Sequence, residues 1–194
     1  MLIDYSLDEF IENTKTKKAN PGGGAVVSLT GILGINLILM LYNLSSFKDS
    51  DIELVKKEKE NLERLSDELK AIMQDDVTSF DDVIKAYKIE DKKQRESALK
   101  EGYLKAIKPP IDTIDRLMEA LNSCENIIKK GSKNALSDGQ IGINLIYDAI
   151  KSSFYNVDIN ASHIDDFSYD KFEILKRAKK LKDKYLEILD RRLL

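Results

Sequence analysis

The stretch "NPGGGAVVSLTGILGINLILMLYNL", residues 20–44, contains no charged side chain, although 34% of the whole chain is charged. It is long enough for a bilayer-spanning helix, which needs about 20 apolar residues. Polar side chains interrupt it, however, and the segments that follow are amphipathic, which favours the central helix of a large soluble bundle. We therefore predict a helix over residues 24–46 that is buried inside the protein, with a membrane span as the less favoured alternative.

The composition of the 194-residue chain indicates a single soluble domain, 1–194, because 42% hydrophobic residues suffice for one sizeable core. The net charge of -3 argues against a nucleic-acid partner, since neutralising phosphates needs a clustered excess of Lys and Arg.

Cysteine and histidine are nearly absent from the sequence. One Cys and one His leave no residues for an intramolecular disulfide or for a thiolate or imidazole metal site. The N-terminal residues lack the apolar core of a signal peptide. We expect a cytoplasmic protein with no metal and no membrane partner.

Helix starts are marked by three capping boxes, in which a Ser is followed three residues later by Glu or Gln; they begin at Ser6, Ser50 and Ser137. Over residues 52–88 the apolar positions recur at spacings of three and four, which predicts one long amphipathic helix.

The rest of the chain also has helical periodicity and no strand-like alternation. Asp91 can cap a helix that runs to about residue 108, where Pro109 and Pro110 kink or break it. Further helices are expected over residues 111–130, 141–162 and 168–194. The sequence thus predicts an all-α bundle of about six helices, packed mostly antiparallel around residues 24–46.

Pro21, Gly22, Gly23 and Gly24 directly precede the central helix. Free backbone N–H groups and the helix dipole favour an anion at such a helix end. The alternative is a tight entry turn with no ligand, which is the commoner use of a glycine triplet.

Asp76 lies on the apolar stripe of the long helix, between Met73 and Phe80. An acid on a core-facing stripe is rarely left unpaired, so it is either functional or a structural acid that pairs with a Lys or caps a neighbouring helix. Asp138 has a simpler explanation, since after Ser137 it would be a first-turn acid that stabilises the helix dipole.

Asn156 and Asn160 stand four residues apart, on one face of a largely apolar helix. Their amides could converge on a ligand or could tie helices together. His163 follows amid polar residues and is expected to be a surface side chain.

Five segments in this order and spacing resemble the formiminotransferase cyclodeaminase family, over nearly the whole chain: "PGGGAVVSLTGILG" from Pro21, "YNL" ending at Leu44, "DDVTSF" ending at Phe80, "NALSDGQIG" from Asn134 and "NVDIN" from Asn156. The resemblance implies an all-helical bundle, usually a homodimer. It also implies a folate one-carbon enzyme, either a formimidoyltetrahydrofolate cyclodeaminase or a methenyltetrahydrofolate cyclohydrolase.

The resemblance implies the following site. Asp76 and Asp138 would supply acid/base and cation-stabilising groups, because both reactions pass through the same cationic folate. Asn156 and Asn160 would bind the pterin, and the glycines with Lys48 would hold the anionic tail. Substrate-binding residues in the shared motifs would further include Pro21, Asn43 and Ser137. A tetrahydrofolate derivative would be the substrate, with no cofactor.

The chain departs from the family pattern at three positions. Phe47 lies where a basic stretch is usual, Gln74 replaces an acid, and Ser132 replaces an Asn. These departures leave a second hypothesis open, namely a non-catalytic helical dimer that kept the scaffold and a ligand pocket.

Overall fold

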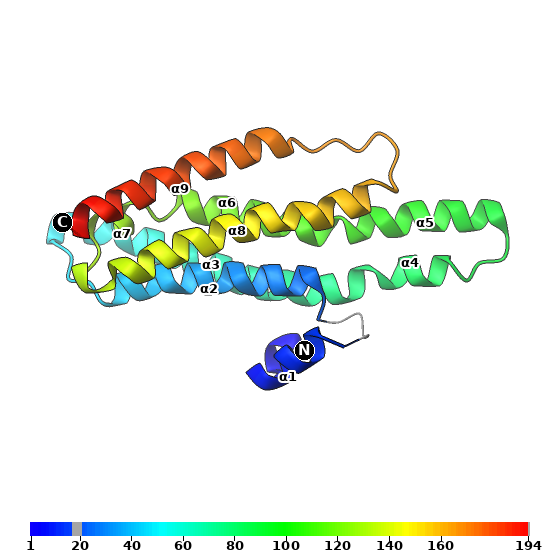
Figure 1. The fold of residues 1–194 in the computed structure, drawn as a ribbon, viewed down its shortest axis with the longest axis horizontal. Coiled ribbons are helices and arrows are strands. Elements are labelled where there is room, and N and C mark those ends of the chain that lie inside the picture. The colour runs from blue at the N-terminus through cyan, green and yellow to red at the C-terminus, as the bar shows by residue number, and fades with distance from the viewer. Residues whose placement is uncertain (17–20, 194) are drawn as a thin grey trace.

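The computed structural model describes residues 1–16 and 21–193, and over these ranges it is helical without any strand (Figure 1). The predicted all-α bundle is confirmed. Seven helices have eight residues or more: α1 (Leu7–Thr14), α2 (Gly23–Asn43), α3 (Asp49–Ser79), α5 (Lys92–Ala106), α6 (Lys108–Asn122), α8 (Leu136–Ala161) and α9 (Lys171–Leu193). The shorter elements are α4 (Asp81–Ala86), α7 (Glu125–Lys130) and the 3-10 turns Leu2–Asp4 and Lys133–Ala135.

Two of the predicted helix caps are confirmed. The Ser6 hydroxyl accepts the Glu9 N–H at 3.2 Å, and the Asp91 carboxylate accepts the Gln94 N–H at 2.8 Å. The starts predicted at Ser50 and Ser137 are wrong. Helix α3 begins two residues earlier than a Ser50 cap implies, with Lys48 as its N-cap and acids in its first turn that offset the dipole. Helix α8 is entered directly from a 3-10 turn without a side-chain cap.

The helix predicted over residues 52–88 is divided at Phe80 into α3 and α4. Just before the division the hydroxyls of Thr78 and Ser79 donate to main-chain carbonyls of the preceding turn, which competes with the helical hydrogen bonds. The break predicted at Pro109 and Pro110 is confirmed: α5 ends at Ala106 and α6 begins at Lys108, with both prolines in its first turn, where N–H groups have no helical partner.

Helix α2 packs most extensively on α8 and then on α3. The closest approach to α8 is at Gly34 and Gly142, where a Cβ on Gly34 would lie 2.9 Å from the Gly142 carbonyl oxygen. Around this crossing the core contains Ile35, Ile38 and Ile146, all fully buried. Each such side chain contributes about 1.5–3 kcal/mol by its burial.

The prediction of a buried central helix holds for the inner face of α2, but the opposite face is not covered within one chain. Val26, Leu33, Met40 and Leu44 recur along this face and are 36–54% exposed. By length and composition alone α2 could cross a membrane, but its inner face belongs to the protein core. The prediction that no membrane is involved stays a prediction.

The α4–α5 hairpin extends past the start of α2 and the end of α8, as the green segment of Figure 1 shows. Since α3 and α8 both end near the start of α2, the five helices α2, α3, α4, α5 and α8 and the loop after α8 meet at this end of the bundle.

Candidate functional site

A cavity of about 340 Å³ lies where these elements meet. It is lined by Gly22, Gly23, Gly24, Asp76, Val77, Ser79, Phe80, Asp81, Ile84, Tyr103, Ala106, Asn156, Ile159, Asn160 and His163. The glycine triplet, Asp76 and both asparagines are therefore brought together, although the glycines and the asparagines are more than 130 residues apart in sequence. Pro21 is buried directly beside them.

The Asp76 carboxylate lies against the main chain of α2. A Cβ on Gly24 would come within 2.3 Å of both carboxylate oxygens, so only glycine admits the acid here. The carboxylate also accepts the backbone N–H of Ala25. Asp76 therefore caps α2 from a neighbouring helix, which is the structural role considered above, and it also faces the cavity.

The environment of Asp76 disfavours its ionised form. Burial raises the pKa of this carboxyl above its ordinary value, and the hydrogen bond from Ala25 opposes the rise only in part. A desolvated carboxylate on a cavity wall attracts a bound cation strongly and can exchange a proton with it.

The two asparagines have different surroundings. Asn160 is buried, and its amide donates to the Ala106 carbonyl at 3.1 Å and to the Asn156 carbonyl at 3.0 Å, so it ties α8 to α5. The Asn156 amide oxygen lies 3.7 Å from the position of a Cβ on Gly23, across the cavity from α2. Asn156 is thus the one whose amide is placed to meet a ligand.

The sequence did not indicate the aromatic wall of the cavity. The Tyr103 ring stacks on the His163 imidazole with centroids 4.0 Å apart and an interplanar angle of 12°. Its hydroxyl shares a hydrogen bond of 3.2 Å with the Tyr87 hydroxyl. A usable signal was Gly102, where a Cβ would lie 2.9 Å from a methyl of Val83, because a glycine inside a helix often marks a close helix contact.

The remaining predicted site residues lie elsewhere in the chain's fold. Asn43 ends α2, Lys48 precedes α3, and Ser137 and Asp138 lie in the first turn of α8. Along α8, the 18 residues from Asp138 to Asn156 correspond to about 27 Å. Within one chain these four residues therefore do not share the cavity of Asp76.

The three departures from the family pattern have structural roles. The Gln74 side chain accepts the Leu2 N–H at 2.8 Å and so holds the N-terminal segment on α3. Phe47 packs on Tyr42 with centroids 5.2 Å apart. The Ser132 hydroxyl accepts the Asn134 N–H at 3.3 Å and so caps the 3-10 turn Lys133–Ala135.

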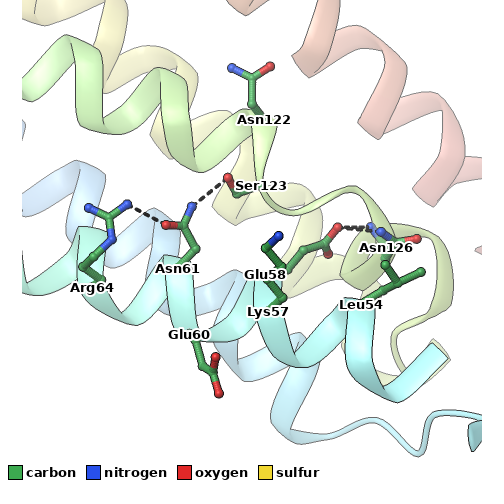
Figure 2. Close-up of a pocket in the computed structure, with 9 residues that line it drawn as sticks. All are labelled: Leu54, Lys57, Glu58, Glu60, Asn61, Arg64, Asn122, Ser123 and Asn126. Carbon is green, nitrogen blue, oxygen red and sulfur yellow. Dashed lines mark hydrogen bonds between the residues drawn. The ribbon is translucent and has the colours of Figure 1, made fainter.

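A larger groove of about 560 Å³ lies between α3 and the α6–α7 junction (Figure 2). Its polar groups are already paired: Glu58 accepts the backbone N–H groups of Asn126 and Ile127, and Asn61 bridges Ser123 and Arg64. The groove is a polar helix junction, and it offers a ligand no unpaired buried group.

Within residues 1–16 and 21–193 there is no group of three or more His, Cys, Asp or Glu side chains placed to share a metal ion. The cavity of Asp76 therefore has to be interpreted from its carboxylate, amides and aromatic rings.

Comparison with known proteins assigns the fold to a family, since residues 6–180 match the profile described as Formiminotransferase-cyclodeaminase. The chain belongs to the formiminotransferase-cyclodeaminase family. Its backbone also superimposes on the crystal structure of formiminotetrahydrofolate cyclodeaminase from Thermotoga maritima with a TM-score of 0.82. That alignment has 26% identity and covers 100% of this chain and 98% of the other.

Curated relatives agree with this assignment. The chain is 27% identical to methenyltetrahydrofolate cyclohydrolase of Methylorubrum extorquens, over 87% of this chain and 85% of the relative. It is 26% identical to formimidoyltransferase-cyclodeaminase of Gallus gallus over 85% of this chain, but this match spans only 32% of that longer protein. The resemblance noted from the sequence is confirmed.

Proposed function

We propose that this chain is a folate one-carbon enzyme. It either closes formimidoyltetrahydrofolate to 5,10-methenyltetrahydrofolate with release of ammonia, or hydrolyses 5,10-methenyltetrahydrofolate. The observation that carries the proposal is the desolvated Asp76 carboxylate, held against Gly24 on the wall of a cavity in a chain of this family.

A buried carboxylate suits both reactions because each has a cationic folate on its path. A cation close to Asp76 would stabilise the ionised carboxyl and would in turn be stabilised by it, more strongly than in water. Asn156 offers the pterin an amide from the opposite wall. Ring stacking on the aromatic wall would favour the flat pterin further.

The anionic tail of the substrate is less well matched to the glycine triplet than the sequence suggested. The Ala25 N–H at this helix end already binds Asp76. A second carboxylate at the same place would be repelled by the first. We propose that Gly22, Gly23 and Gly24 border the cationic part of the substrate and that the tail leaves the cavity elsewhere.

We propose further that the enzyme is a homodimer. The exposed apolar stripe on α2 runs beside Ile141, Tyr155 and Ile159 of α8, which are 51–67% exposed. Large contiguous apolar surfaces of this kind mark protein interfaces. A two-fold pairing of this face with itself is the commonest way to bury it.

Such a pairing would also complete the predicted site. If two α2 helices cross antiparallel with Leu33 at the axis, the end that carries Asn43 lies beside the partner's Gly23. Lys48, Ser137 and Asp138 lie at that same far end. The partner's Asp138 would then approach the cavity of Asp76, and the partner's Lys48 would be available to the substrate tail.

No metal, redox cofactor, nucleic-acid or membrane partner belongs to this proposal. Both reactions move only protons, water or ammonia, and a net charge of -3 does not suit binding to phosphate backbones. We also propose a cytoplasmic location, because a chain whose one cysteine can form no intramolecular disulfide suits a reducing compartment.

An absorbance assay tests the proposal, because 5,10-methenyltetrahydrofolate has a band at the edge of the ultraviolet. If the enzyme is a cyclodeaminase, the band should appear with formimidoyltetrahydrofolate as substrate. If it is a cyclohydrolase, the band of methenyltetrahydrofolate should disappear faster than in buffer. Binding of a folate analogue without turnover of either substrate would favour the non-catalytic dimer, and no binding at all would refute both.

Mixing two variants tests the composite site. Asp76→Asn and Asp138→Asn should each be inactive alone. After mixing under exchange conditions, half of the dimers are mixed, and one of their two sites has both acids. Recovery of about a quarter of wild-type activity is therefore expected. No recovery despite subunit exchange would show that the two acids do not meet.

A further inference from the structure

His163 is the only histidine of the chain, and it lies in the loop that follows α8. Its imidazole lines the cavity of Asp76 on one side and a second cavity of about 540 Å³ on the other. One ring face is stacked on Tyr103. Among the residues that the structure describes, neither ring nitrogen has a hydrogen-bond or ion-pair partner, so both are available to a ligand.

We propose that His163 is the proton carrier of this active site, acting beside Asp76. This inference rests on the proposed function and adds a second catalytic group, the His163 imidazole, to the Asp76 carboxylate. Histidine is the side chain that most readily both takes and gives a proton near neutral pH. Stacking on Tyr103 restricts rotation of the His163 imidazole and leaves the ring edges that carry the two nitrogens uncovered, which favours proton transfer to a bound substrate.

Ring closure needs one such group. N10 attacks the amidinium carbon, forming the N10–C bond, and the N10 proton has to leave. The bond from carbon to the formimino nitrogen then breaks, and that nitrogen must receive a proton to depart as ammonia. One residue that accepts the first proton and donates the second balances the reaction, with the positive charge kept on the methenyl product.

Hydrolysis needs the same group. Water adds to the methenyl carbon and loses one proton. The carbon–N5 bond then breaks as N5 is protonated, and the remaining hydroxyl loses its proton to become the formyl carbonyl, so one proton is released to solvent in total. In both reactions Asp76 can remain ionised next to the cation while His163 accepts and donates the proton.

The other titratable groups on the cavity are less suited to this task. The Tyr103 hydroxyl is bonded to Tyr87, and burial raises the pKa of Tyr103 to about 12. Asp81 is exposed at the start of α4, as His163 is in its loop, but His163 is held in place by its stacking on Tyr103. The charged groups that face His163 from the second cavity are Lys93, Glu96, Lys100 and Asp165, which carry both signs.

Two substitutions separate proton transfer from ring packing. His163→Phe keeps an aromatic ring to stack on Tyr103, whereas His163→Gln keeps a polar side chain; neither can exchange the proton. With the substrate that the wild type turns over, both variants should lose about 100-fold or more in kcat. Affinity for 5-formyltetrahydrofolate should change less than about threefold, and added imidazole should restore part of the activity of His163→Gln.

A wild-type level of kcat in His163→Phe would overturn the proposal and make the residue a stacking platform. Loss of analogue binding in both variants with unchanged kcat at saturation would overturn it as well, in favour of a binding role. If instead the wild type itself turns over neither substrate, the proposed function fails first. The two failures are therefore distinguishable from one set of measurements.

Discussion

Gly24→Ala is the sharpest test of the site, because the structure gives the size of the displacement. The new Cβ would lie 2.3 Å from both Asp76 oxygens, where an ordinary contact is 3.4 Å or more. The carboxylate must therefore move by about 1 Å. Misplacement of a catalytic group by about 1 Å costs on the order of 100-fold in rate, so we expect kcat to fall by about that factor.

The fold should survive this change. Losing the cap that Asp76 provides costs about 1 kcal/mol, and replacing Gly by Ala in a helix regains about 1 kcal/mol. The thermal midpoint, followed by circular dichroism, should thus move by only a few degrees.

Gly23→Ala is the matched control for this substitution. Its Cβ would have its nearest neighbour, the Asn156 amide oxygen, at an ordinary 3.7 Å. Because Gly23 borders the cavity, the added methyl can raise KM, but we expect kcat at saturating substrate to stay within about threefold of wild type in the absorbance assay. If both alanine variants fold and are equally active, the function of Asp76 does not depend on the position of its carboxylate, and the reasoning is refuted.

Three further predictions follow from single positions. Asp76→Asn should abolish turnover and keep the fold, since Asn caps a helix as well as Asp. Because burial raises the pKa of Asp76, ionisation of this carboxyl costs more in the folded state, so the stability of the wild type should fall as the pH rises through that pKa. Urea titrations of the Asp76→Asn variant at the same pH values should lack this fall. Leu33→Glu, on the exposed stripe, should give monomers in sedimentation, whereas Leu54→Glu, equally exposed on α3, should not. Gly34→Ala should lower the free energy of unfolding by about 1–3 kcal/mol, because its Cβ would press on the Gly142 carbonyl, and an unchanged urea midpoint would contradict that packing.

The sequence predicted the helical architecture well because the signals for helices are local. Apolar spacing identified the amphipathic helices, and Ser6 and Asp91 marked their starts through contacts within one turn. The division at Phe80 was missed because nothing in the apolar pattern changes there. It is produced by hydroxyl-to-carbonyl bonds of Thr78 and Ser79, which sequence periodicity does not register.

The candidate site was predicted less completely because it depends on distance between elements. Asp76 was singled out by its place on an apolar stripe, and the structure puts it on the wall of the cavity. Asp138 was grouped with it by motif alone, although the two lie at opposite ends of the bundle. His163 was predicted to be a surface side chain and is exposed, but only the packing of α5 against the loop after α8 reveals that it stacks on Tyr103.

The start of α2 shows how a tertiary contact changes the meaning of a sequence motif. Three glycines before an uncharged helix suggest an anion site, because free N–H groups carry partial positive charge. Here the protein supplies the anion itself: Asp76, 52 residues after Gly24, reaches the Ala25 N–H in the space that the missing Cβ leaves. The helix end then no longer attracts anions but holds a partly desolvated carboxylate at a fixed position. Such a helix end favours a cation over an anion, so under the proposed function the glycines that suggested a tail site would border the methenyl cation instead.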